Sequence, residues 1–331
     1  MPRLAPSLFW QSRRQISPLA PLLLPVCRDL QSTSNEIRWI REHVHSHPSV
    51  IPPKLRIWQL CEKRSNGTPL QYVLGTQPFG SLEILCRKGV LIPRHETESY
   101  TLHLSSMLPS NTPLKIIDLC TGTGCIPLLL SSSNSHPSST AVGIDISHKA
   151  ISLAKQNLLH SFSSFISPPE NMMKFLQNDI FSPSIFSHLP SSPDILTANP
   201  PYISRRSFSS GETTRSVRNF EPKLALVPEP RLKKASEKRY GCREEDVFYA
   251  RILEIAKEIK PKRVLFEVAG WEQAARVVEM AQKEHEDYET IEIWRDEVHE
   301  TTDKVETAEI GGRQIAVIGE GDGRAVYLSR V

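Results

Sequence analysis

The sequence predicts an α/β fold, with a doubly wound, mostly parallel sheet that follows a small helical domain. The first observation is a buried-type strand, residues 115–119, that runs into a glycine-bearing turn and then into a helix. The second is a strand over residues 141–145 that ends in an acid. The third is that further strand-like runs alternate with helical stretches, which is the order typical of parallel β-α-β units.

Length and charge narrow the class of protein. A chain of 331 residues suits one domain of about 200–250 residues and a smaller one. The formal net charge is +3, but residues 1–28 hold four arginines and no acid. The rest of the chain has 36 basic and 37 acidic residues, a balance of −1, so it lacks the basicity typical of nucleic-acid-binding proteins. We therefore expect no direct nucleic-acid partner.

The first 28 residues have the composition of an organelle transit peptide, because they carry arginines, serines and leucines but no acid. Their longest apolar stretch, residues 19–27, contains Pro21 and Pro25 and is too short to span a bilayer. A secretory signal fits less well, since the basic residues are spread out. A disordered N-terminus without an address is the third alternative. We expect a transit peptide over residues 1–28, a location in the mitochondrial matrix and no membrane partner.

The cysteines and histidines predict no metal site. The six cysteines form no C-x-x-C pair and fit neither a zinc site nor a dense disulfide framework, so we expect reduced thiols. His43 and His47 lie one helical turn apart, but no cysteine stands near them and Glu42 points off that face. Solvated histidines are therefore the interpretation that we adopt.

Three helical stretches predict a small helical domain over residues 29–76. The first follows a capping box at residues 33–36, and the second begins at the proline pair 52–53. The third, residues 69–74, is capped by Gly75.

A β-hairpin is expected to connect this domain to the larger one. Its predicted strands are residues 82–86, which alternate in polarity, and the apolar run 90–92, with a turn at 88–89 between them. The hairpin linker therefore covers residues 77–93, and the larger domain covers residues 94–331.

The turn after the first strand of the larger domain has the composition of a nucleotide cradle. It consists of Cys120, Thr121, Gly122, Thr123 and Gly124. The two glycines let the backbone approach a ligand, and the N–H groups of the helix that starts near Gly124 face that ligand. A dinucleotide fingerprint requires a third glycine where this chain has Pro127. The turn therefore favours the carboxylate of an amino-acid-bearing nucleoside over a pyrophosphate.

Two acids follow the next strands at positions that suit such a ligand. Asp145 ends the second strand 21 residues after Gly124, where a carboxylate binds ribose hydroxyls in a doubly wound sheet. The alternative is that Asp145 caps the helix that starts at Ser147. Asp179 ends a third, shorter strand over residues 174–179, and Asp179 with Ile180 lies where an adenine ring is expected.

The stretch Asp194–Tyr202 predicts a fourth strand with a rigid loop at its end. Ile195 and Leu196 are apolar, and the prolines at 200 and 201 must leave the sheet because proline cannot donate to a strand ladder. The Asn199 side-chain oxygen and the Pro200 carbonyl are placed to accept both hydrogens of a planar –NH2 group, and Tyr202 to stack on its π-system. A proline-rich turn after an edge strand is the alternative.

The remaining stretches complete the α/β pattern. Residues 204–218 and 231–239 are basic and polar, which is typical of solvated loops, with partner binding as the alternative. The expected elements that follow are a helix over 244–260, a strand over 263–268, a helix over 271–284 and a strand over 290–294. Residues 315–318 and 325–329 are both strand candidates, and one of them is expected to be the last strand of the sheet.

Five motifs together resemble the HemK/PrmC family. They are residues 68–75, 91–98, 118–124, 199–202 and 220–222, and the resemblance covers about residues 35–330. Members of this family are S-adenosylmethionine-dependent protein N5-glutamine methyltransferases that act on peptide chain release factors. Because Asn-Pro-Pro-Tyr is shared with adenine-N6 methyltransferases, the stretch from Gly75 to Glu98 is what favours this family.

The resemblance implies a class I, Rossmann-like, seven-stranded methyltransferase domain and an N-terminal helical domain that helps to dock the release factor. It implies S-adenosyl-L-methionine as the cofactor and the glutamine of a Gly-Gly-Gln loop as the methyl acceptor. Together with the leader, it implies a mitochondrial release factor as the partner.

By position, the resemblance also implies roles for single residues. The cofactor is expected to contact Cys120, Thr121, Gly122, Thr123, Gly124, Asp145, Asp179, Ile180 and Asn199. The glutamine is expected to contact Asn199, Pro200, Pro201 and Tyr202, with Asn199, Pro200 and Tyr202 as catalytic residues. The family commonly has glycine at position 120 and, in bacterial members, an aromatic residue at position 180. We therefore expect a narrower approach to the cofactor and aliphatic packing of the adenine.

An amide nitrogen is a poor nucleophile, so the hypothesis is that Asn199 and Pro200 aim it at the methyl group without a metal or a strong general base. Methylation of adenine N6 in DNA or RNA is the first alternative, because its –NH2 group is chemically alike. A non-catalytic assembly factor is the second alternative.

Overall fold

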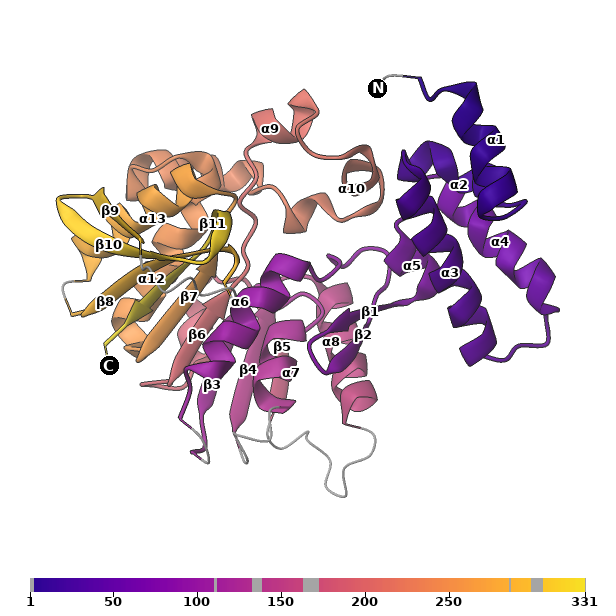
Figure 1. Cartoon of the computed structure of the whole chain (residues 1–331). Helices are drawn as coiled ribbons and strands as arrows, with labels where there is room; N and C mark the ends of the chain where they lie inside the picture. The colour runs from indigo at the N-terminus through magenta and orange to yellow at the C-terminus, as the bar shows by residue number, and fades with distance from the viewer. Residues whose placement is uncertain are drawn as a thin grey trace. The chain divides into compact units, whose positions relative to one another are not determined.

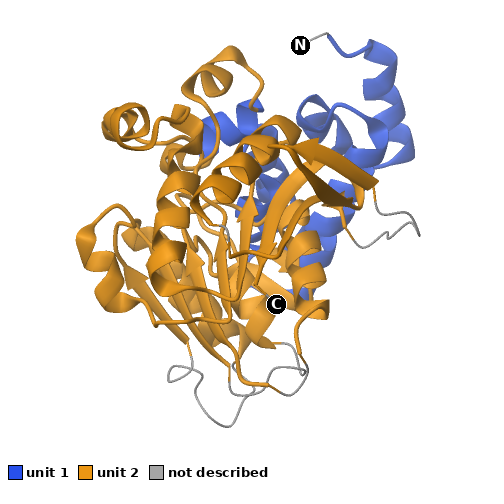
Figure 2. Cartoon of the chain, turned by 90° about the vertical axis from the view of Figure 1, so that its left-hand side faces the viewer, with its two compact units in different colours: residues 1–76, 214–220 blue, residues 77–213, 221–331 orange. Residues whose placement is uncertain are grey.

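The chain folds into two compact units (Figure 2). The computed structural model describes residues 3–109, 112–132, 139–162, 173–285, 287–298 and 306–330. Unit 1 comprises residues 1–76 and 214–220, and unit 2 comprises residues 77–213 and 221–331. No helix among the described residues has both the length and the apolarity that crossing a membrane requires.

Unit 1 is helical (Figure 1). Its helices are α1 (Pro6–Gln15), α2 (Ala20–Cys27), α3 (Leu30–Ser46), α4 (Pro53–Ser65), α5 (Leu70–Leu74) and α10 (Arg215–Phe220). Helix α3 starts earlier than the capping box predicts, because Asp29 is its N-cap and accepts a hydrogen bond from the Ser32 N–H at 2.7 Å. The segment 214–220 returns to this unit through the Ser216 hydroxyl, which donates to the Gly67 carbonyl at 3.2 Å.

The predicted leader is part of the core of unit 1. Ala20, Leu23 and Leu24 are fully buried, and the cluster that holds Ala20 and Leu23 also contains Ile37 and Ile40 of α3. The helical unit therefore begins before residue 29, which was its expected start. Removal of the leader after import stays a prediction, and the structure adds that such a cut would take away buried side chains.

The hairpin differs from its predicted strands. β1 (Thr76–Phe79) pairs with β2 (Leu82–Leu85), whereas residues 90–92 form no strand. Phe79 and Ile84 are fully buried in a cluster of unit 2. Apart from Thr76, the hairpin therefore belongs to the larger unit and contributes Phe79 and Ile84 to its core.

Unit 2 is built on a nine-stranded sheet with the order β5-β4-β3-β6-β7-β11-β8-β10-β9. The strands are β3 (Lys115–Leu119), β4 (Thr140–Asp145), β5 (Met173–Gln177), β6 (Ile195–Ala198), β7 (Arg263–Glu267), β8 (Thr290–Glu297), β9 (Glu306–Ile310), β10 (Arg313–Ile318) and β11 (Glu320–Ser329). β3 to β7 are mutually parallel, and β11 runs antiparallel to β7 and β8.

The expectation of seven strands is therefore exceeded by two. Both C-terminal candidates are strands, with β11 between β7 and β8 and β10 on the outer side of β8. The two additional edge strands, β9 and β10, are joined through Gly311 and Gly312, which adopt left-handed φ angles of 59° and 77°.

Helices cover both faces of this sheet (Figure 1). Alternate residues of β3 belong to different core clusters, Ile116 to one and Ile117 to the other. Helices α12 (Val247–Ile259) and α13 (Trp271–Glu284) contribute to the Ile117 cluster. Helices α6 (His95–Ser106), α7 (Cys125–Ser132) and α8 (His148–Ser161) contribute to the Ile116 cluster. Burial on both faces explains why the parallel strands read as nearly continuous apolar runs.

Candidate active site

A pocket lies in unit 2 at the carboxyl ends of β3, β4, β5 and β6, the edge where ligands bind in open α/β sheets. Nine of the predicted site residues line it, namely Cys120, Thr121, Gly122, Thr123, Asp145, Asp179, Ile180, Asn199 and Pro201. Three predicted residues, Gly124, Pro200 and Tyr202, are not among the residues that line the pocket. The structure therefore brings the turn, the two acids and the Asn-Pro-Pro-Tyr loop to one place.

The turn after β3 uses its two glycines differently. A Cβ atom on Gly122 would meet only the Cys120 carbonyl oxygen, at 4.0 Å, so the space beside Gly122 is open toward the pocket. A Cβ atom on Gly124 would lie 2.8 Å from the Phe175 ring. Gly124 therefore permits close packing of α7 against β5, which differs from the close ligand approach expected of it. Cys120 adopts a left-handed φ of 61°, the conformation that glycine adopts at lower cost.

Asp145 holds the turn in place. Its Oδ2 accepts the Gly122 N–H at 2.9 Å, and its Oδ1 accepts the Ser147 N–H at 2.8 Å. The N-cap of helix α8 is Ser147, whose side chain accepts the Ala150 N–H, and Asp145 supports this cap by accepting the Ser147 N–H. Burial raises the pKa of Asp145, while the two N–H groups oppose this effect. Each carboxylate oxygen retains a lone pair for a ligand hydroxyl.

Asp179 has a partner that the sequence did not reveal. Its Oδ1 accepts the Phe181 N–H at 3.0 Å, and its Oδ2 pairs with Arg231 at 2.8 Å. Arg231 lines the pocket, although the sequence places it at the start of a basic run typical of solvated loops. Ile180 is 4% exposed and provides the aliphatic surface expected beside an adenine.

Glu267, the last residue of β7, organises the Asn-Pro-Pro-Tyr loop, although the sequence alone assigned it no role. Its carboxylate accepts the Asn199 Nδ2–H at 2.7 Å and the Tyr202 hydroxyl at 3.0 Å. Thr97 and Tyr100 of α6 donate to the same carboxylate at 2.5 and 2.8 Å. Burial raises the pKa of Glu267, and the donated hydrogen bonds oppose that shift.

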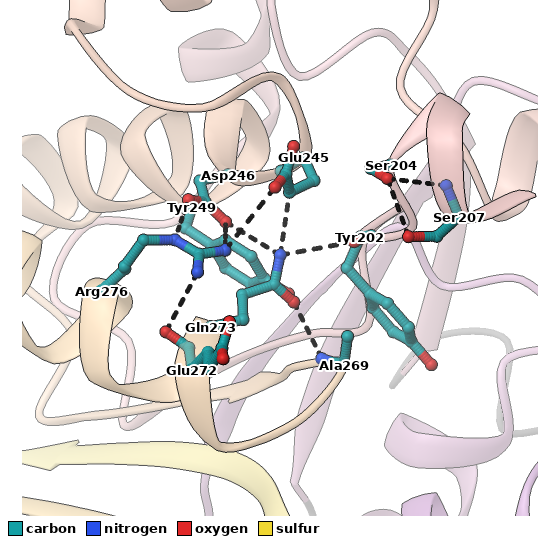
Figure 3. A network of polar contacts seen from close by, with 10 residues as sticks. All are labelled: Tyr202, Ser204, Ser207, Glu245, Asp246, Tyr249, Ala269, Glu272, Gln273 and Arg276. Carbon is teal, nitrogen blue, oxygen red and sulfur yellow. Dashed lines mark hydrogen bonds and ion pairs between the residues drawn. The ribbon is translucent and has the colours of Figure 1, made fainter. Parts of the chain in front are cut away.

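A second network holds the backbone of Tyr202 (Figure 3). The Gln273 amide donates to the Tyr202 carbonyl at 3.3 Å and to the buried Asp246 carboxylate at 2.9 Å. Arg276 pairs with Asp246 at 2.6 Å, and the Gln273 oxygen accepts the Ala269 N–H at 2.8 Å. Tyr202 is thus fixed at both its backbone and its ring hydroxyl.

An ion pair closes the side of the pocket. Arg94 donates to Glu221 at 2.7 Å, and the Ile92 N–H donates to the other oxygen of Glu221 at 3.2 Å. The Glu221 side chain is 2% exposed and that of Arg94 is 31% exposed. Arg94, Ile92 and the following Pro222 line the pocket. Arg94 and Glu221 both belong to motifs of the HemK/PrmC resemblance, but sequence alone assigned them no role.

The pocket fits S-adenosyl-L-methionine by the chemistry of its donors and acceptors. The open space beside Gly122 adjoins the start of α7, whose first turn carries no acid and suits a carboxylate. Asp145 offers acceptors for a ribose diol, and Ile180 and Phe248 provide apolar surface for a purine.

Comparisons with known proteins agree with this chemistry. No protein-family model matches the chain. The chain is 43% identical over 235 residues to the mitochondrial MRF1 N(5)-glutamine methyltransferase MTQ1 of Saccharomyces cerevisiae, with 69% of each chain covered. It is 38% identical to the probable MRF1 mitochondrial N(5)-glutamine methyltransferase mtq1 of Schizosaccharomyces pombe, with 62% of this chain and 69% of that protein covered. It is 31% identical to the release factor glutamine methyltransferase of Bacillus subtilis, with 71% and 74% covered.

A solved structure supports the fold. The hMettl16 catalytic domain, crystallised with the MAT2A 3′UTR hairpin 1, matches with a TM-score of 0.51 and 12% identity, covering 89% of this chain and 91% of that one. At this identity the likeness shows the fold alone. The nucleotide-type cradle, the Asn-Pro-Pro-Tyr loop and the identity to the yeast and bacterial proteins lead to one conclusion: this chain belongs to the family of release factor glutamine methyltransferases and is an S-adenosylmethionine-dependent enzyme.

Proposed function

We propose that this enzyme transfers a methyl group to the side-chain nitrogen of the glutamine in the Gly-Gly-Gln motif of a mitochondrial peptide chain release factor. The observation that carries the proposal is the position of Asn199, which lies at the pocket edge with its Nδ2–H bound to Glu267. Its Oδ1 is then the polar atom left for a substrate –NH2 group. The names of the yeast relatives support a mitochondrial release factor and, with the predicted leader, a matrix location.

When bound, S-adenosyl-L-methionine supplies an electrophilic methyl group. Cys120, Thr121, Gly122 and Thr123 would hold its amino-acid end, Asp145 its ribose, and Asp179 with Ile180 its adenine. Gly124 serves this arrangement indirectly by letting α7 pack against β5.

The residues of the loop would orient the acceptor. Asn199 Oδ1 and the Pro200 carbonyl accept the two amide hydrogens, which aims the nitrogen and favours its developing acidity. Pro201 lines the pocket beside Asn199. Tyr202, whose hydroxyl is bound to Glu267, would contact the glutamine side chain from the loop end. The proton leaves the nitrogen only after methyl transfer has made it acidic, so a strong base is not required.

Mass spectrometry of a mitochondrial release factor, incubated with the enzyme and S-adenosyl-L-methionine, tests the proposal. We expect one added methyl group on the Gly-Gly-Gln glutamine and none when that glutamine is changed to alanine. An adenine-containing oligonucleotide in a parallel reaction tests the alternative substrate. Methylation of the oligonucleotide alone would contradict the proposed substrate.

A further inference from the structure

Glu267 receives more hydrogen bonds than its place at the end of a strand requires. It is 1% exposed, and four side chains donate to it. Oε2 accepts from Thr97, Tyr100 and Asn199, and Oε1 accepts from Tyr202. Tyr249 also donates to the Glu267 backbone carbonyl at 2.7 Å, which fixes the main chain. Both the side chain and the backbone of this residue are therefore held rigidly.

These contacts determine which way the Asn199 amide faces. An ionised carboxylate only accepts hydrogen bonds, so the Asn199 group that faces Glu267 at 2.7 Å must be the donor, Nδ2. The amide oxygen is then turned to the other side. Among the described residues, no hydrogen bond occupies that oxygen, and Asn199 lines the pocket. An asparagine without such a neighbour has no preferred amide orientation, because the oxygen and the –NH2 group of the amide have nearly the same shape.

We propose that Glu267 is a positioning residue that orients Asn199 so that its oxygen faces the substrate nitrogen, and that it holds Tyr202 in register with that oxygen. The inference rests on the proposed function, since it concerns how the acceptor amide is recognised. Glu267 is not among the residues that line the pocket, so it acts through Asn199 and Tyr202. Glu267 excludes the flipped orientation of the Asn199 amide. In that orientation the Asn199 –NH2 group would face the substrate –NH2 group, so that two donors would meet.

The substitution Glu267→Gln keeps the size of the side chain but is expected to reverse the orientation of the Asn199 amide. The amide introduced at position 267 can donate to Asn199 Oδ1, which turns the Asn199 –NH2 group toward the substrate. The hydroxyls of Thr97, Tyr100 and Tyr202 can rotate to accept as well as donate, so the fold tolerates the change. We expect kcat to fall about 100-fold, the size typical of losing one preorganised polar contact. KM for the release factor and Kd for S-adenosyl-L-methionine should change less than about threefold.

A reciprocal exchange tests whether this loss acts through Asn199. In the double variant Glu267→Gln/Asn199→Asp, the amide at position 267 donates to one oxygen of the carboxylate at position 199, and the other oxygen faces the substrate as an acceptor. We expect kcat of the double variant to exceed that of Glu267→Gln by at least about tenfold. Asn199→Asp alone should be poor, because two carboxylates would then lie within hydrogen-bond distance of each other. A purely structural role of Glu267 predicts no such rescue.

Glu292→Gln is the control, since Glu292 also has a raised pKa but is only partly buried, lies on β8 and is outside the pocket residues. It should keep wild-type kcat. Wild-type kcat in Glu267→Gln would overturn the inference, as would a double variant whose loss equals the product of the two single losses. Absence of glutamine methylation by the wild-type enzyme would instead contradict the proposed function, so the two failures are distinguishable. Melting curves of all variants show whether each one is folded when it is assayed.

Discussion

Removing Arg94 should destabilise unit 2 more than removing its whole ion pair. The Glu221 side chain is 2% exposed, so Arg94→Ala would leave a buried carboxylate that keeps, among the described residues, the Ile92 N–H as its partner. Breaking a fully buried pair in this way costs about 3–5 kcal/mol. Because Arg94 is 31% exposed and water can reach the pair, we expect a smaller cost, about 2–3 kcal/mol. For a unit of this size that corresponds to a fall in Tm of about 5–10 °C.

The comparison variant is Arg94→Met/Glu221→Gln, which removes both charges and keeps the volume. Its stability should lie within about 1 kcal/mol of wild type, since no charge is left buried without a partner. Calorimetry gives Tm, and hydrogen exchange at residues 90–94 and 221–227 localises the loss, which matters because two units need not unfold in one step. Equal Tm values for Arg94→Ala and the double variant would refute the reasoning. Either variant should weaken cofactor binding only if the pocket wall at Ile92, Arg94 and Pro222 moves.

Three further outcomes are expected. Asn199→Ala should lose most turnover while calorimetry still detects S-adenosyl-L-methionine binding, and wild-type-like turnover would contradict the proposed mechanism. Leu23→Ala should cost about 2–5 kcal/mol, because Leu23 is fully buried, and hydrogen exchange should show the loss in α2 and α3; the exposed Leu22→Ala is its control. Burial raises the pKa of Asp118 to about 7. Between about pH 4 and pH 7 the Asp118 carboxyl is therefore protonated in the folded state but ionised in the unfolded state. The free energy of unfolding of the wild type should fall as pH rises through that window. In Asp118→Asn this contribution should disappear from denaturation curves measured across that range, and unchanged pH dependence would show that Asp118 titrates normally.

The sequence was sufficient for features that are local. The turn at residues 120–124, Asp145 at the end of its strand and the prolines after β6 follow from neighbouring residues, since strand ends, glycine turns and proline stops are short-range patterns. Because parallel strands end at one edge of the sheet, these pieces could also be expected to meet.

What the sequence could not predict depends on long-range contacts. Glu267 lies within the strand expected over residues 263–268, and its partner Asn199 lies 68 residues away along the chain. Arg94 and Glu221 are separated by 127 residues. The leader has the composition of a transit peptide. Composition alone does not show the contacts with the rest of unit 1 that bury Leu23. Gly124 looked like a ligand contact because its neighbour Phe175 is distant in sequence.

The discontinuous make-up of unit 1 has a consequence for how the protein is synthesised. Residues 214–220 belong to the same unit as residues 1–76, yet the ribosome adds them 137 residues after Gln77 begins the intervening chain. Helices α1 to α5 can form early because their contacts are local, but the unit gains its last segment only when most of the parallel strands have been made. The nascent chain therefore carries an incomplete helical unit for the time needed to translate that stretch, about 7–30 s at typical rates. During this interval the Gly67 carbonyl lacks the hydrogen bond that the Ser216 hydroxyl of α10 donates to it in the folded unit.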